Sequence, residues 1–260
     1  MRTPHLLLAG LLLATWSAVS GADNDWSRVP AAEFESVLAE SEGDNLIELA
    51  AFELETMPVS NREFLAFLKA HPDWRRDRVA PLFADEKYLS QWQGPLNPGD
   101  GQLDLPVTRV SWFAALAYCE ARGARLPTWY EWEWVAAADG SRADARTDPL
   151  WRQRILSWYS KTGGELRPVA SGNPNLYGIY DLHDLVWEWV DDFGALIVAA
   201  DNRTQGDPDQ LKFCGAGALS MEMRENYAVL MRIAMLSSLQ ASYTTANLGF
   251  RCARSVEEMR

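Results

Sequence analysis

Asn247-Leu-Gly-Phe-Arg-Cys-Ala-Arg254, near the C-terminus, is the stretch of sequence that decides the fold. It is the last of several short motifs that follow one another from about Phe52 to Arg254. The others, in chain order, are Val110-Ser-Trp112, Ala117-Tyr-Cys119, Arg125-Leu-Pro-Thr-Trp-Tyr-Glu-Trp-Glu133, Asn173-Pro-Asn-Leu-Tyr-Gly-Ile-Tyr-Asp181 and Val186-Trp-Glu-Trp189. Chance is a poor explanation for so many motifs in one order across most of the chain.

In content and order these motifs resemble the formylglycine-generating enzyme family, also called the sulfatase-modifying factor family. The resemblance implies an α+β, single-domain fold that is irregular, C-type-lectin-like and low in regular secondary structure. We therefore expect residues 23–260 to form one formylglycine-generating-enzyme-like domain. Through Phe213-Cys-Gly-Ala-Gly217 and Asn247–Cys252, the chain most resembles the NirV-type proteins associated with copper nitrite reductase in denitrifiers.

Residues 1–22 are predicted to be a secretory signal peptide. Arg2 precedes an apolar run that ends in the small residues Ser20-Gly-Ala22. The run is too short for a spanning helix. We expect cleavage near Ser20 to Ala22 and a soluble protein, periplasmic in a Gram-negative host; an uncleaved membrane anchor is the alternative.

The chain is acidic, with a formal net charge of -12 at pH 7. An excess of negative charge repels nucleic acid and anionic lipid. We therefore expect no nucleic-acid partner and, after signal cleavage, no membrane partner.

Local patterns predict one strand and three helix starts in the first half of the domain. Alternating apolar residues over Ile47–Leu54 indicate a strand. Ser60 and Ser111 are predicted N-caps of helices that end before Pro72 and at Gly123. A third helix is expected to begin at Thr128 with a capping box, because a glutamate follows three residues later.

Other segments give weaker patterns. Residues 72–105 contain several prolines and are predicted to be irregular. Residues 138–170 show no clear period, and a second calcium site there is left open. The apolar spacing over Glu222–Ala241 predicts an amphipathic helix. We expect the indoles of the third predicted helix to pack in the core rather than to bind sugar: Trp129, Trp132 and Trp134.

The segment Asp181–Trp189 is the first candidate site. Calcium takes about six to eight oxygen ligands, and carboxylates with exposed backbone carbonyls supply them. The resemblance implies a structural calcium ion held by four groups: the side chains of Asp181 and Glu188 and the carbonyls of Asp184 and Val186. The alternative is an acidic surface loop anchored by its two tryptophans.

Two residues of this segment need separate comment. Asp184 stands where the resembled family usually has glycine, and it either adds a ligand or distorts the turn. His183 is expected to be a hydrogen-bonding surface residue rather than a ligand. Since His71 and His183 are the only histidines after the signal segment, a three-histidine iron centre is excluded.

The chain has three cysteines, and the resemblance pairs Cys119 with Cys252 in a disulfide. Cys214 is then a free thiol. Its thiolate would serve as a nucleophile, a soft-metal ligand or a redox group, so Cys214 is the candidate catalytic residue. A buried, inert cysteine is the alternative.

The resemblance implies that formylglycine formation needs two thiolates that bind Cu(I). The family's two cysteines would fall near Ser220 and Glu225, which are not soft ligands, so the paired thiolates are missing. Copper is therefore a candidate cofactor only through Cys214, and we expect no formylglycine-generating activity.

Three functions remain open. The first is an exported accessory or maturation protein that supports an exported protein or peptide client, such as a copper nitrite reductase. The second is an oxidase on the same fold that acts on a peptide or small molecule. The third is a non-catalytic binding module.

Overall fold

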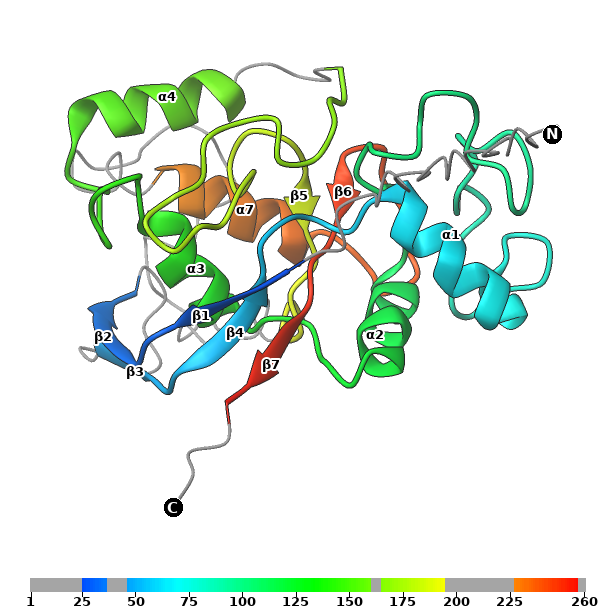
Figure 1. Ribbon diagram of the computed structural model, residues 1–260, viewed down its shortest axis with the longest axis horizontal. Coiled ribbons are helices and arrows are strands. Elements are labelled where there is room, and N and C mark those ends of the chain that lie inside the picture. The colour runs from blue at the N-terminus through cyan, green and yellow to red at the C-terminus, as the bar shows by residue number, and fades with distance from the viewer. Residues whose placement is uncertain (1–24, 37–45, 160–164, 195–226, 257–260) are drawn as a thin grey trace, which may run out of the picture.

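The computed structural model describes residues 25–36, 46–159, 165–194 and 227–256 (Figure 1). These residues mix short strands with helices, as the α+β prediction expects. The elements, in chain order, are β1 (Trp26–Val29), β2 (Ala32–Glu35), β3 (Leu46–Leu49), β4 (Phe52–Glu55), α1 (Asn61–Ala70), a 3-10 helix η1 (Pro72–Trp74), α2 (Trp112–Ala121), α3 (Trp129–Ala137), α4 (Pro149–Tyr159), β5 (Trp187–Glu188), α7 (Tyr227–Ser237), β6 (Leu248–Gly249) and β7 (Ala253–Ser255).

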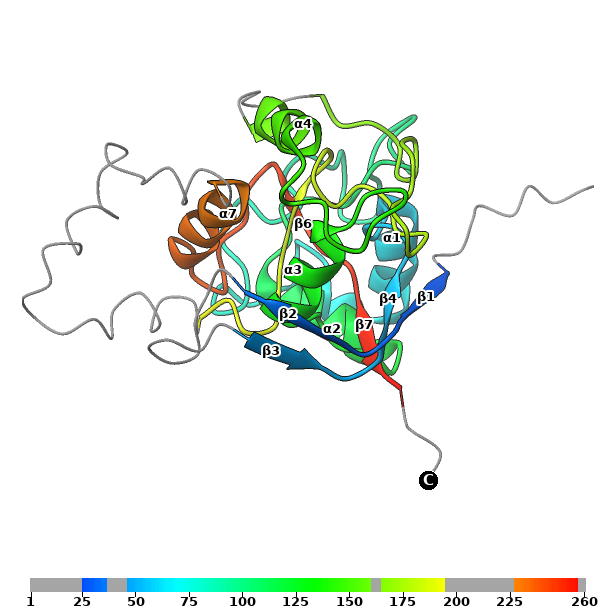
Figure 2. The same cartoon turned by 90° about the vertical axis from the view of Figure 1, so that its left-hand side faces the viewer.

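A three-stranded antiparallel sheet, in the order β1-β4-β7, joins the two ends of the domain. Val29 pairs with Phe52, and Leu54 pairs with Ala253, so the last motif of the sequence is tied to the first strands. In both views α3 lies between the β2–β3 pair and α4 (Figures 1 and 2).

The single strand predicted over residues 47–54 is wrong, because the chain forms two strands there. β3 pairs with β2, and after Ala50 and Ala51 the chain continues as β4 and pairs with β1. The buried positions change phase at the break, from Ile47 in β3 to Phe52 and Leu54 in β4. Alternating apolar residues indicate which positions of a strand are buried, but they do not indicate which strand is its partner.

The three predicted N-caps are confirmed. The Ser60 hydroxyl accepts from the Glu63 amide, and the Glu63 carboxylate accepts from the Ser60 amide, which closes a capping box on α1. Ser111 caps α2, and Thr128 caps α3 in the predicted capping box. Each cap contact joins residues three positions apart, so the local sequence is enough to predict it.

Residues 138–170 contain α4, although the sequence shows no clear period there. Only a small face of this helix is buried, where Trp151 and Ile155 pack with Ala145. A local signal was present, since Asp148 accepts from the amides of Leu150 and Trp151 at 2.8 and 3.3 Å. Pro149 follows this cap, in the first position of the helix, where proline is favoured.

The structure of two further segments agrees with the predictions from the sequence. Residues 72–105 contain η1 and no other helix or strand, and α7 lies inside the predicted 222–241 helix. Residues 222–226 fall outside the described residues.

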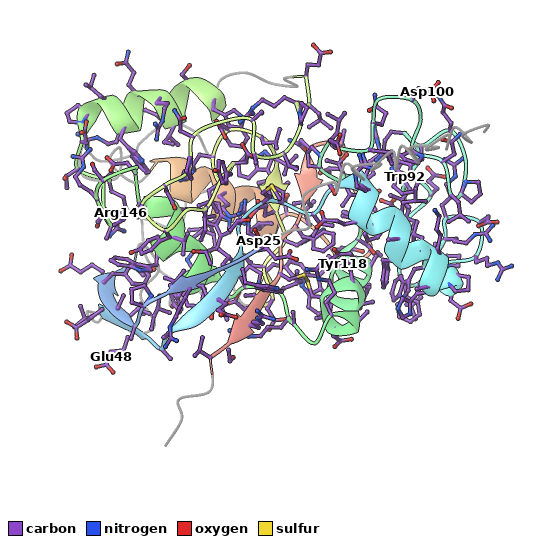
Figure 3. The ribbon with its side chains drawn as sticks, in the orientation of Figure 1. Asp25, Glu48, Trp92, Asp100, Tyr118 and Arg146 are labelled. Atoms are coloured by element: carbon purple, nitrogen blue, oxygen red, sulfur yellow. A yellow bond between two sulfur atoms is a disulfide. The ribbon has the colours of Figure 1, made fainter. Side chains whose placement is uncertain are left out.

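The core contains the predicted indoles and the predicted disulfide. Trp129 and Trp132 are each 1% exposed, and Trp134 packs, partly buried, against the same core cluster. Cys119 and Cys252 are bonded and have no exposed surface. Tyr118, labelled in Figure 3, lies beside this disulfide and packs on aromatic rings from α1 and the last motif: Phe64, Phe67 and Phe250.

Candidate functional site

The short parallel pair of β5 and β6 brings together two motifs that are far apart in the sequence. The Trp187 amide donates to the Asn247 carbonyl at 2.8 Å, and the Trp189 amide donates to the Gly249 carbonyl at 3.0 Å. A Cβ atom on Gly249 would lie 2.6 Å from the Val107 carbonyl oxygen, so only glycine fits there. This pairing places the last motif against the Asp181–Trp189 loop.

Glu188 and Arg251 form a fully buried ion pair as a result. Arg251 Nη2 donates to Glu188 Oε1 at 2.8 Å, and Nε donates to Oε2 at 3.0 Å. Trp132 Nε1 donates to the same Oε2 at 2.9 Å. The remaining donors of Arg251 reach three backbone carbonyls, those of Glu55, Thr56 and Tyr180. The buried charge is therefore paired and its hydrogen-bonding groups are satisfied.

Asp181 is held by a different arginine. Its Oδ1 accepts from Arg167 Nη2 at 2.9 Å, and its Oδ2 accepts from the Ala170 amide at 2.6 Å. Asp181 has a φ of 61°, a left-handed conformation that aspartate adopts more readily than most residues. Burial raises the pKa of Asp181, while the Ala170 amide and the Arg167 guanidinium oppose that rise.

Arg167 also binds Asp184. Its Nη1 donates to the Asp184 carbonyl oxygen at 2.5 Å, and its Nη2 lies 2.9 Å from Asp184 Oδ2. The side chain of Asp184 is 55% exposed, whereas that of Asp181 is 0% exposed. One guanidinium therefore links the buried and the exposed carboxylate of this loop.

Three of the four expected calcium ligands contact one of two arginines. The structure brings the Asp181 side chain and the Asp184 carbonyl together on Arg167, and it places Glu188 on Arg251. Val186, fully buried, lies in the same loop just before β5. Among the described residues, no group of three or more His, Cys, Asp or Glu is placed to hold a metal ion.

This donor set, as arranged, does not fit a calcium ion bound by both carboxylates. A dication there would face two guanidinium groups that already use the oxygens it needs. Calcium binding stays a prediction. Neither arginine was predicted as a partner of these carboxylates; Arg251 lies inside the Asn247–Arg254 motif, whereas no local pattern marks Arg167.

His183 makes a hydrogen bond, as expected, but it is half-buried rather than at the surface. Its ring lies edge-on to the indoles of Trp132 and Trp151, with centroids 5.5 Å away in each case. Nε2 faces the Ala136 carbonyl oxygen at 2.7 Å and so donates to it. Burial lowers the pKa of His183 to about 4, and the imidazole is neutral at neutral pH.

Several predictions fall on other parts of the chain. Cys214 and the neighbouring Ser220 and Glu225 lie outside the described residues, as does the segment 1–22. Of the helices in the described ranges, none has the length and apolar character needed to cross a membrane.

The chain belongs to the family of the sulfatase-modifying factor enzyme 1-like domain, which it matches over residues 19–256. It is 28% identical over 247 residues to the inactive C-alpha-formylglycine-generating enzyme 2 of Mus musculus, covering 80% of this chain and 77% of that protein. It is 30% identical over 253 residues to the formylglycine-generating enzyme of Thermomonospora curvata, covering 80% of this chain and 83% of that enzyme.

Two solved structures also resemble the chain at low identity. CarF has a TM-score of 0.46 and 16% identity, over 90% of this chain and 99% of CarF. PvdO from Pseudomonas aeruginosa has a TM-score of 0.45 and 18% identity, over 89% of this chain and 94% of PvdO.

Proposed function

We propose that this family member does not generate formylglycine and acts instead as an accessory or maturation protein for a client protein or peptide. The cysteine count carries the proposal. The chain has three cysteines, and the structure uses Cys119 and Cys252 in the buried disulfide, which leaves Cys214 as the single thiol. A Cu(I) site of two thiolates, which the family resemblance implies for formylglycine formation, needs one more soft ligand.

The relatives are consistent with either outcome. The chain is similar both to a mouse protein named as inactive and to a Thermomonospora curvata protein named as a formylglycine-generating enzyme. Overall similarity therefore does not separate the two activities. The missing second free cysteine supports the loss of formylglycine-generating activity.

The client is proposed to be an exported protein such as a copper nitrite reductase. The apolar segment over residues 1–22 supports export to the periplasm, and the resemblance of Phe213–Gly217 and Asn247–Cys252 to NirV-type proteins supports the nitrite reductase setting. The C-type-lectin-like description of the fold belongs to the same proposal. An oxidase that uses Cys214 and a non-catalytic binding module are the alternatives.

A direct assay tests the loss of formylglycine chemistry. The purified protein, loaded with copper, is incubated with a Cys-x-Pro-x-Arg peptide, and mass spectrometry is used to detect the aldehyde product. The Thermomonospora curvata enzyme is the positive control, and Cys214→Ser is the matched variant. We expect no product from this protein; turnover that disappears in Cys214→Ser would show that one thiol is sufficient.

The client is tested separately. A copper nitrite reductase is produced in a denitrifying host with and without this protein, and the copper content of the purified reductase is measured. We expect lower copper occupancy when the protein is absent. Equal occupancy and equal activity in the two preparations would exclude this client.

A further inference from the structure

Three oxygen atoms of the Asp181–Trp189 loop converge on the guanidinium of Arg167. They are Asp181 Oδ1 at 2.9 Å, the Asp184 carbonyl at 2.5 Å and Asp184 Oδ2 at 2.9 Å. A Cβ atom built on Gly172 would lie within 3.6 to 3.8 Å of Arg167 Nη2, Asp181 Oδ1 and Asp184 Oδ2. These atoms therefore lie close together, next to Gly172, which has no side chain.

We propose that Arg167 supplies, from within the chain, the positive charge that the family resemblance assigns to calcium in this loop. Its contacts include two of the four expected calcium ligands, the Asp181 side chain and the Asp184 carbonyl. A third expected ligand, Glu188, is neutralised by Arg251. Two arginines thus neutralise the carboxylates of this loop, and the structure of the loop does not depend on calcium.

The chemistry of the guanidinium suits this role. It carries a fixed charge and five N–H donors in a planar fork, so one group can bind a carboxylate and a carbonyl side by side. Calcium needs about six to eight oxygen ligands, more than this loop presents free of arginine. Asp184, where the resembled family usually has glycine, provides Arg167 with an extra carboxylate.

Arginines also pair with aspartates in residues 138–170, where a second calcium site was left open. Arg142 pairs with both Asp139 and Asp148, and Arg146 pairs with Asp144 at 2.7 Å. Hydrogen bonds from Arg142 hold the pKa of Asp139 and of Asp148 below their usual values. These three aspartates are thus also neutralised by arginine.

The test compares thermal unfolding with excess calcium and with a chelator. We expect the wild-type melting temperature to be the same in both solutions. Arg167→Ala leaves two carboxylates and a carbonyl without their cation, and it should lower the melting temperature by about 3–6 °C. The control Arg62→Ala breaks the exposed Arg62–Asp104 pair, 2.7 Å long, and should lower it by less than about 2 °C.

A second variant covers the case in which Arg167→Ala does not fold. Arg167→Lys keeps the charge but loses the planar fork, so its melting temperature should lie between those of the wild type and Arg167→Ala. The proposal is overturned if chelation lowers the melting temperature of the wild type. It is also overturned if elemental analysis finds one tightly bound calcium ion per chain, or if Arg167→Ala is no less stable than Arg62→Ala.

Discussion

Glu188→Gln breaks a fully buried ion pair, and we expect it to destabilise the folded state strongly. Both members of the Glu188–Arg251 pair are 0% exposed, and the guanidinium contacts both carboxylate oxygens. Glutamine keeps the shape of the side chain but removes its negative charge, so Arg251 stays buried without a counter-charge. Breaking a buried ion pair in this way costs about 3–5 kcal/mol.

The structure favours the lower end of that range. Arg251 keeps three acceptors, the carbonyls of Glu55, Thr56 and Tyr180, and the glutamine oxygen can still accept from Trp132. We therefore expect a loss of about 3 kcal/mol in the free energy of unfolding. For a domain of this size, that loss corresponds to a melting temperature lower by about 6–12 °C.

Urea unfolding and thermal unfolding of the purified variants measure this effect. The double variant Glu188→Gln, Arg251→Met should lose less stability than the sum of the two single variants, because neither charge is then left alone. Arg62→Ala, in an exposed pair, is the matched control and should cost about 0.5 kcal/mol. If Glu188→Gln costs no more than this control, the reasoning about the buried pair is refuted.

Two further predictions concern the disulfide and a buried carboxyl group near it. Cys119 and Cys252 close a loop with a sequence separation of 133, so replacing both with alanine should lower the free energy of unfolding by about 5 kcal/mol in the chain-entropy model. Peptide mapping without reduction should show the two linked, and a linkage to Cys214 would contradict the pairing. Burial raises the pKa of Glu55 from 4.5 to about 8, against the influence of Arg122. Between these values the folded state keeps a proton that the unfolded state has released, so stability falls as pH rises from about 5 to 8. Glu55→Gln should make urea unfolding less dependent on pH in this window; an unchanged slope would show that Glu55 does not titrate there.

The sequence by itself determined the features that depend on nearby residues or on whole motifs. The caps at Ser60, Ser111 and Thr128 are contacts across three residues, so their chemistry is visible in the order of the chain. The motifs indicated the family, and the disulfide between Cys119 and Cys252 followed from that resemblance. Core packing of the indoles of α3 was predictable, because burial of large aromatic rings contributes strongly to stability.

Only the tertiary structure decided which charges meet. Glu188 lies 63 residues from Arg251, and Asp181 lies 14 residues from Arg167, and no local pattern connects either pair. The sequence therefore showed carboxylates in a loop but did not show their cations. The reason is physical: a cap is closed by the backbone of its own turn, whereas a buried carboxylate takes its partner from whichever segment the fold packs beside it.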